Sequence, residues 1–184
     1  SLVMAPPHKE NALLSSMITE NAAKEAEQWV NEAIKEGASC LKGHTRNGAF
    51  YSPTLLTHTT WDMSVNAEEV FAPILSIHSY ENLDTLLNEL NESLFGLQIG
   101  LFTRHIDRAM KAYHELDVGA VLINQVPTWR VDHMPYGGVK SSGNTREGVR
   151  YAIEEMTIPK LCVMIIMALP ISEVIVLSRS KICA

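Results

Sequence analysis

The chain has 184 residues, of which 46% are hydrophobic and 20% charged, with a formal net charge of −6 at pH 7 and an isoelectric point near 5.6. This composition is typical of a folded globular protein and excludes extended disorder. An acidic chain without a lysine- and arginine-rich tract lacks the basic face that phosphate binding needs, so nucleic acid is not expected as a partner.

The cysteines and the apolar segments of the sequence indicate where in the cell the protein is expected. Cys40, Cys162 and Cys183 form no Cys-x-x-Cys pair, and their odd number argues against a disulfide framework, which favours a reducing, cytoplasmic location. The first residues lack the charged and apolar regions of a signal peptide. The apolar run at residues 161–171 is too short to span a bilayer, so no membrane association is expected. Ser1 and Leu2 precede Met4, which is consistent with a vector remnant or a processed end.

The first predicted element is a helix over residues 17–37, because its apolar positions recur at helical spacing. Thr19 is the expected N-cap, and Gly37 the expected stop. A strand is predicted at residues 38–42 and a second at 50–57, where Pro53 would confine the strand to a sheet edge or a bulge.

From residue 73 onward, predicted strands and helices alternate. They are a strand at 74–78, a helix at 82–91, a strand at 97–103, a helix at 106–116, a strand at 118–124, a helix at 146–156 and a strand at 160–166. Apolar strands separated by helices are typical of parallel sheets covered by helices. The sequence therefore predicts an α/β fold with a parallel-rich sheet flanked by helices.

The loop DHMPYGGVKSSGNTREG, residues 132–148, comes after the strand predicted at 118–124 and is rich in glycine. It is not a Walker A loop, because Asn144 stands where that motif has lysine, and the glycine spacing of dinucleotide-binding loops is also absent. A tight turn without a ligand and a wall of an active site both remain compatible with this composition.

A second unusual stretch is EEVFAP at residues 68–73. Glu69 could accept hydrogen bonds from sugar hydroxyls, and Phe71 could pack against a flat ring. The alternative is a solvated carboxylate beside a phenylalanine of the core.

A third stretch, NQVPTWR at residues 124–130, follows the carboxyl end of a predicted strand, where ligands bind in open α/β sheets. Trp129 offers an apolar wall, and Arg130 offers a planar cation suited to a carboxylate or phosphate. The alternative is a packed loop in which Arg130 pairs with Asp132.

Other catalytic patterns are missing from the sequence. No Gly-x-Ser-x-Gly elbow occurs, and Cys40 and Cys162 fall in predicted strands, where cysteines are usually buried packing residues. The seven histidines show no metal-ligand spacing, so no metal site is expected.

Taken in order, these segments resemble the C-terminal part of the catalytic domain of an NAD(P)-dependent aldehyde dehydrogenase. The resemblance extends from residue 17 to 163 and rests on EEVFAP (68–73), FGLQIGLFTR (95–104), GAVLIN (119–124), MPYGGVKSSG (134–143) and REG (146–148). The segment VDHMPYGGVK is most similar to the lactaldehyde and phosphonoacetaldehyde dehydrogenases, whose substrates are small and often anionic. The expected organisation is a leading segment at 1–16, a partial catalytic domain at 17–164 and an atypical apolar tail at 165–184.

The resemblance implies roles for particular residues. Glu69 matches the glutamate that holds the nicotinamide ribose hydroxyls of NAD or NADP, and Phe71 matches the aromatic beside the nicotinamide. The loop residues expected to line the aldehyde tunnel are Asn124, Thr128, Trp129, Arg130 and Tyr136. Within that set, Arg130 is expected to bind an anionic group of the substrate.

The chain also departs from the family pattern. The nucleophilic cysteine, the general base and the dinucleotide-binding domain of the family precede the part that matches residue 17, and no cysteine here aligns with the nucleophile. The resemblance thus implies a truncated chain that neither turns over nor binds NAD or NADP alone. Thr145 replaces a family glycine, and a left-handed threonine there would cost on the order of 1 kcal/mol.

Two other functions remain open on the sequence. One is a non-catalytic module that forms homo-oligomers, with the apolar stretch at 161–171 as an exposed strand edge that recruits a partner. The other is one half of a split enzyme, complemented by a separate N-terminal chain that carries the cysteine.

Overall fold

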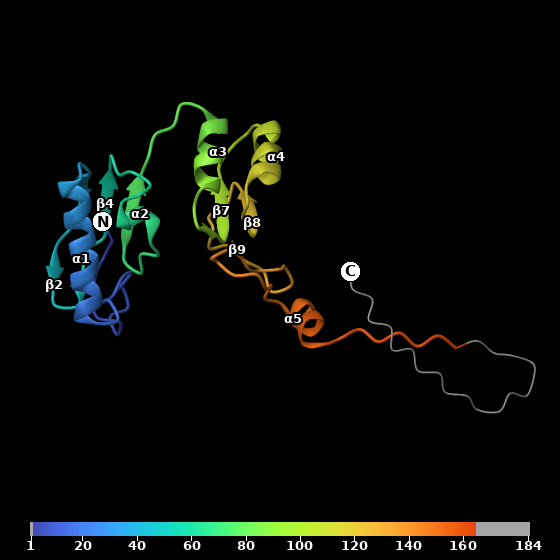
Figure 1. The fold of residues 1–184 in the computed structure, drawn as a ribbon. Coiled ribbons are helices and arrows are strands. Elements are labelled where there is room, and N and C mark those ends of the chain that lie inside the picture. Colours follow the sequence, from blue (N-terminus) through green and yellow to red (C-terminus); the bar gives the residue numbers. More distant parts are fainter. Residues whose placement is uncertain (1, 165–184) are drawn as a thin grey trace, which may run out of the picture.

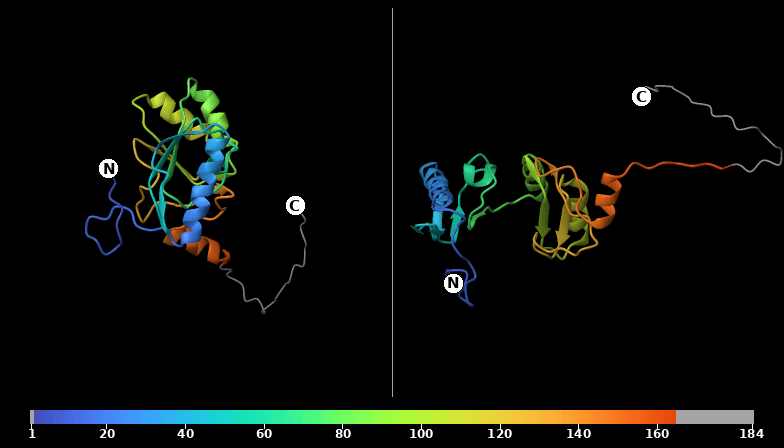
Figure 2. Two further views of the ribbon diagram at one scale, coloured as in Figure 1. Left: turned by 90° about the vertical axis from the view of Figure 1, so that its left-hand side faces the viewer. Right: turned by 90° about the horizontal axis from the view of Figure 1, so that it is seen from below.

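The computed structural model describes residues 2–164, in which two units are joined by an extended segment between β5 and α3 (Figures 1 and 2). The elements of the first unit are α1 (Glu20–Lys35), β1 (Ser39–Lys42), β2 (Arg46–Asn47), β3 (Phe50–Tyr51), β4 (Thr54–Thr57), α2 (Ser64–Ala67) and β5 (Ile74–Ile77). Those of the second are α3 (Leu83–Asn91), β6 (Phe95–Gly96), β7 (Gln98–Leu101), α4 (Ile106–Glu115), β8 (Ala120–Ile123), β9 (Val139–Lys140) and α5 (Val149–Met156).

Helix α1 begins and ends where its sequence predicts. The Thr19 side chain accepts a hydrogen bond from the Ala22 amide at 3.1 Å, which satisfies one of the free amides of the first turn. Gly37, with φ of 114°, turns the chain away after the helix. The buried face consists of alanines and one valine, Ala23, Ala26, Val30 and Ala33. These small side chains let the helix lie close against the sheet.

The first unit contains a three-stranded sheet in the order β1-β4-β5, with β4 antiparallel to β1 and parallel to β5. The prediction of one strand at 50–57, confined by Pro53 to an edge or a bulge, is wrong, because the chain divides there into β3 and β4. Pro53 lies between the two strands, outside any ladder, so its missing N–H does not prevent β4 from occupying the centre of the sheet.

Tyr51 belongs to the core of this unit and is only 1% exposed. Its hydroxyl lies 2.9 Å from His44 Nδ1. Burial raises the pKa of the Tyr51 hydroxyl above its ordinary value of 10.0, because the phenolate would lose its hydration.

This raised pKa makes stability depend on alkaline pH. Above a pH of about 10 the unfolded chain releases a proton that the folded chain retains, so the free energy of unfolding should fall as the pH rises. Below that pH the contribution of Tyr51 to stability should be constant. Urea denaturation at a series of pH values measures how steeply the free energy of unfolding falls with pH, and Tyr51→Phe should make this fall shallower. An unchanged slope in the variant would contradict this assignment.

The second unit is built around the parallel pair β7 and β8, joined by α4. Asn82 caps α3, because its side chain accepts hydrogen bonds from the amides of Asp84 and Thr85. The core of this unit consists of Leu87, Ala112 and Leu116, with partly buried residues of β7 and β8 packed against them. The predicted helices at 82–91 and 106–116 are thus confirmed, and so is the parallel pairing of β7 with β8, the strands that flank the second helix. The strands that flank the first helix, β5 and β7, are not paired.

The sheet is divided, however, rather than continuous. The described residues form one three-stranded and three two-stranded sheets. The strand predicted at 160–166 is wrong for its described part, because residues 157–164 form no strand; residues 165 and 166, like the tail at 165–184, lie outside the described residues. The short elements α2, β2, β6 and β9 were not predicted, since two to four residues show no periodicity.

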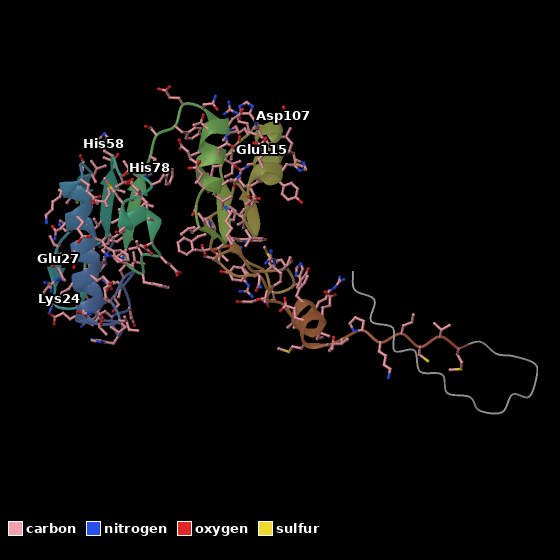
Figure 3. The ribbon with its side chains drawn as sticks, in the orientation of Figure 1. Lys24, Glu27, His58, His78, Asp107 and Glu115 are labelled. Atoms are coloured by element: carbon pink, nitrogen blue, oxygen red, sulfur yellow. The ribbon has the colours of Figure 1, made fainter. Side chains whose placement is uncertain are left out.

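Charged side chains are spread over the outer faces of the helices. Figure 3 shows Lys24 and Glu27 on α1 and Asp107 and Glu115 on α4, in different units. Glu27 pairs with Arg46 at 2.7 Å, and Glu115 lies 3.5 Å from Lys111. These pairs are exposed or half-buried and contribute little to stability individually.

Candidate functional site

The loop after β8 begins at Asn124, which adopts a left-handed conformation with φ of 56°. Its side-chain oxygen accepts a hydrogen bond from the Thr103 amide at 2.8 Å, and its own amide donates to the Leu101 carbonyl. The chain therefore turns sharply at the carboxyl ends of two parallel strands. Asn124 and Trp129 line a hollow of about 460 Å³ with residues of β8 and Met134.

Arg130, Tyr136 and Glu147 form a cluster beside that hollow, which we call the arginine cluster. The Arg130 guanidinium lies over the Tyr136 ring, 4.4 Å from its centroid, and its Nη1 lies 2.9 Å from Glu147 Oε2. Tyr136 and Glu147 are themselves joined by two backbone hydrogen bonds, at 3.3 and 2.6 Å. The interpretation in which Arg130 pairs with Asp132 is wrong, because its carboxylate partner is Glu147.

Gly137 of the loop and Gly119 before β8 are required by close backbone contacts. A Cβ at Gly137 would lie 2.2 Å from the Thr145 carbonyl oxygen, and a Cβ at Gly119 would lie 1.7 Å from the Gly137 carbonyl oxygen. Arg146 closes the loop by donating to the carbonyls of Gly138 and Thr145 at 2.7 and 2.9 Å. The loop is thus packed against the start of β8.

Predictions were also made for two threonines of this region, Thr128 and Thr145. Thr128, predicted to line the tunnel, lies exposed in the same loop as Trp129. Thr145 has no positive φ, so the backbone strain expected of a threonine at a family glycine position is wrong. In the loop at 132–148 the positive φ angles fall instead on Lys140, Gly143 and Gly148, at 56°, 110° and 123°.

Glu69 and Phe71 lie in the first unit, between α2 and β5. Phe71 is 81% exposed, so the interpretation that made it a core residue is wrong. Both side chains line a hollow of only about 80 Å³, beside Trp29 of α1. An exposed carboxylate next to an exposed ring fits a ribose and a flat heterocycle chemically, and the hollow could enclose only an edge of such a group.

The predicted residues thus fall into two sets. Asn124 and Trp129 line one hollow, and the arginine cluster begins at the next residue of the same loop, whereas Glu69 and Phe71 belong to the other unit. None of the hollows described for residues 2–164 is lined by members of both sets.

Sequence reasoning missed two residues of this site. Glu147 was noted only as part of the REG motif, although a carboxylate in a motif near an expected anion-binding arginine could have suggested a pair. Gly119 was noted only as part of a strand motif, and its contact with Gly137 depends on the fold.

The described residues contain no group of three or more histidine, cysteine or acidic side chains placed to hold a metal ion. Cys40 and Cys162 are exposed, so their expected role as buried packing residues is wrong. Among the helices described, none combines the length and apolar character needed to cross a bilayer.

Sequence comparison places these features in a family. The aldehyde dehydrogenase family profile matches residues 1–162. The 3-sulfolactaldehyde dehydrogenase of Priestia megaterium is 47% identical over 163 residues, which are 89% of this chain and 34% of that protein. The lactaldehyde dehydrogenase of Methanococcus aeolicus is 38% identical over 156 residues, 85% of this chain and 33% of that protein. The chain therefore spans about a third of the length of these relatives.

Structural comparison agrees. Aldehyde dehydrogenase 21 from Physcomitrella patens, solved in complex with the reaction product succinate, superposes with a TM-score of 0.82 and 40% identity, over 84% of this chain and 32% of that one. A glyceraldehyde-3-phosphate dehydrogenase from Methanocaldococcus jannaschii, complexed with NADP, gives 0.79 and 36% over 84% of this chain and 34% of that one. The predicted α/β fold is confirmed, and the chain belongs to the aldehyde dehydrogenase family.

Proposed function

We propose that this chain forms one wall of an NAD(P)-dependent enzyme that oxidises a small anionic aldehyde to the carboxylic acid. The observation that carries the proposal is the arginine cluster beside the hollow at Asn124 and Trp129. A half-exposed guanidinium held in place on two sides keeps N–H groups available to a carboxylate, sulfonate or phosphate. Two relatives are named for sulfolactaldehyde and sulfoacetaldehyde, whose sulfonates are anionic groups of this kind. A third relative was solved with its reaction product succinate, which carries carboxylates.

The chain's own residues would act by binding and orienting. Arg130 would hold the anionic end of the aldehyde, while Asn124, Thr128, Trp129 and Tyr136 would line its path. Glu69 would accept hydrogen bonds from the ribose hydroxyls of NAD or NADP, and Phe71 would pack beside the nicotinamide. The cofactor, when bound, supplies the acceptor for the hydride removed from the aldehyde carbon.

Turnover is proposed to need the rest of the family's polypeptide, since the chain spans about a third of its relatives and no cysteine aligns with the nucleophile. NADH or NADPH formation from 3-sulfolactaldehyde should be absent with this chain alone. It should appear when the remaining two thirds of the Priestia megaterium relative are supplied as a second polypeptide. Turnover by the chain alone would contradict the proposal, and so would no turnover by the mixture.

Arg130→Leu should affect anionic aldehydes selectively in that complemented mixture. Loss of a charged hydrogen bond should lower kcat/KM for 3-sulfolactaldehyde by roughly 10- to 100-fold, and leave propanal nearly unchanged. Arg150→Leu is the matched control, because Arg150 lies on α5 with an 80% exposed side chain and pairs with Glu154. Equal losses for the charged and neutral aldehydes would refute the assignment of Arg130.

A second candidate function is self-association. Helix α5 has no buried residue, and its apolar side chains Val149, Ile153 and Met156 are 81%, 57% and 85% exposed. An apolar helix face of this kind favours a homo-oligomeric contact. Light scattering during size exclusion should then give at least twice the monomer mass, and Ile153→Glu should return the chain to a monomer. A monomer at all concentrations would exclude this candidate.

A further inference from the structure

We propose that a second hollow, between the end of β7 and the start of α4, binds the phosphate group of a small anion. Its volume is about 520 Å³. It lies at the carboxyl ends of parallel strands, where ligands bind in open α/β sheets. This hollow, which we call the α4 hollow, is lined by Phe102, Thr103, Arg104, His105, Arg108 and Asn124. The inference does not rest on the proposed function, because no residue of the arginine cluster lines the α4 hollow.

The charges of the α4 hollow favour an anion. Two arginines and a histidine line it, and no acidic side chain of the described residues does. Within residues 2–164, the guanidiniums of Arg104 and Arg108 have no hydrogen-bonded or ionic partner. The other arginines of that range each have a carboxylate or carbonyl partner, and they are Arg46, Arg130, Arg146 and Arg150. Two guanidiniums suit one phosphate rather than the row of phosphates in a nucleic acid.

The two arginines also stand where a helix disfavours positive charge. A helix N-terminus carries a partial positive charge, so acidic side chains are favourable in the first turn and cations are not. Helices α1 and α3 follow this rule, because each has a side-chain cap and an acidic residue in its first turn. Helix α4 has no side-chain cap in the described chain, Arg108 lies in its first turn, and Asp107 (Figure 3) does not line the hollow. A bound anion would offset this unfavourable placement.

Asn124 adds an uncharged donor to the α4 hollow. Its Oδ1 accepts a hydrogen bond from the Thr103 amide at 2.8 Å, which fixes the side chain at the ends of β7 and β8. Its Nδ2 donates to no group in the described part of the chain, so these N–H groups are available to a ligand. The guanidiniums and this amide together supply N–H donors, and the ionised oxygens of a phosphate are acceptors.

Phe102 bears on what the phosphate is attached to. Its side chain lines the same hollow and is 66% exposed. An exposed aromatic ring beside two guanidiniums fits a phosphate ester with a flat organic group, because that group would pack against the ring. Free phosphate would use the guanidiniums alone. The phosphate group is common to both ligands, and the two are separated by experiment.

Titration of the full chain with inorganic phosphate tests the site. The backbone amides of residues 103–108, followed by NMR at constant ionic strength, should shift saturably with a Kd of about 1 mM. Chloride at the same ionic strength should produce no saturable shift. The absence of saturable shifts at residues 103–108 would overturn the site, and so would equal shifts with chloride.

Arg104→Gln and Arg108→Gln should each raise the Kd for phosphate by roughly tenfold, because each removes a charged hydrogen bond. Both side chains are exposed, so the variants should fold, as judged by circular dichroism. Arg150→Gln is the matched control, since that arginine is exposed and pairs with Glu154. Arg130→Leu should also leave the Kd unchanged, which separates the α4 hollow from the arginine cluster. Equal weakening by the control, or loss of binding in Arg130→Leu, would overturn the proposal.

Phenyl phosphate distinguishes a phosphate ester from free phosphate. If the site takes an ester, phenyl phosphate should bind about two- to tenfold more tightly than inorganic phosphate, and Phe102→Ala should remove that difference. If the two ligands bind equally and Phe102→Ala changes neither Kd, the site takes free phosphate. Both results support a phosphate site in the α4 hollow. Phenyl phosphate that binds Arg104→Gln and Arg108→Gln as tightly as the parent chain would overturn it, because the ring alone would then be recognised.

Discussion

Replacing Leu56 by alanine is expected to lower the free energy of unfolding by about 2–5 kcal/mol. Leu56 is fully buried at the centre of β4, where it contacts the core formed by α1 and α2. Truncation removes three carbon atoms from that core and leaves a cavity that small neighbours cannot fill. The alanines of α1 have no alternative rotamers with which to close it.

Urea denaturation followed by circular dichroism measures this loss. Leu75→Ala is the matched control, because Leu75 lies on the neighbouring strand with a 62% exposed side chain and should change stability by less than about 1 kcal/mol. If the two variants lost equal stability, Leu56 would not be the centre of the core.

The long helices could be predicted from sequence, because each depends on a local pattern. Thr19 and Gly37 mark the ends of α1 through capping and left-handed geometry, which are properties of those residues themselves. The centre of the first sheet could not be predicted in the same way. Pro53 suggested an edge strand, but whether a proline disturbs a ladder depends on where the strand begins, and β4 begins one residue later.

In the candidate site, too, local patterns predicted some features, and others depend on the fold. The loop residues Asn124, Trp129, Arg130 and Tyr136 follow one another closely in the chain, and the family resemblance alone was sufficient to propose them as a group. The one carboxylate that the sequence offered as an alternative partner of Arg130 was Asp132, two residues away, whereas the structure has Glu147, seventeen residues away. That choice is made by the antiparallel pairing of Tyr136 with Glu147, a contact that no local pattern encodes.

Gly119→Ala is expected to displace the loop at residues 134–138 and to cost about 3 kcal/mol, the upper end of the range for overpacking. The added Cβ would lie 1.7 Å from the Gly137 carbonyl oxygen and 2.8 Å from that of Leu97. Both neighbours are backbone atoms, so no side-chain rotation relieves the contact. The start of β8 is held by β7, and the loop is therefore the part that must move.

Loop movement would also release the arginine cluster, since Tyr136 is adjacent to Gly137 and its ring supports the Arg130 guanidinium. Limited proteolysis should cut Gly119→Ala within residues 130–147 faster than the parent chain. Gly48→Ala is the control: its Cβ would meet no atom within 4 Å, and only its φ of 57° is strained, at a cost of about 1 kcal/mol. Unchanged proteolysis of the loop in Gly119→Ala would show that the contact between Gly119 and Gly137 does not hold the loop in place. The faster cleavage expected instead would make a residue without a side chain a determinant of where Arg130 lies.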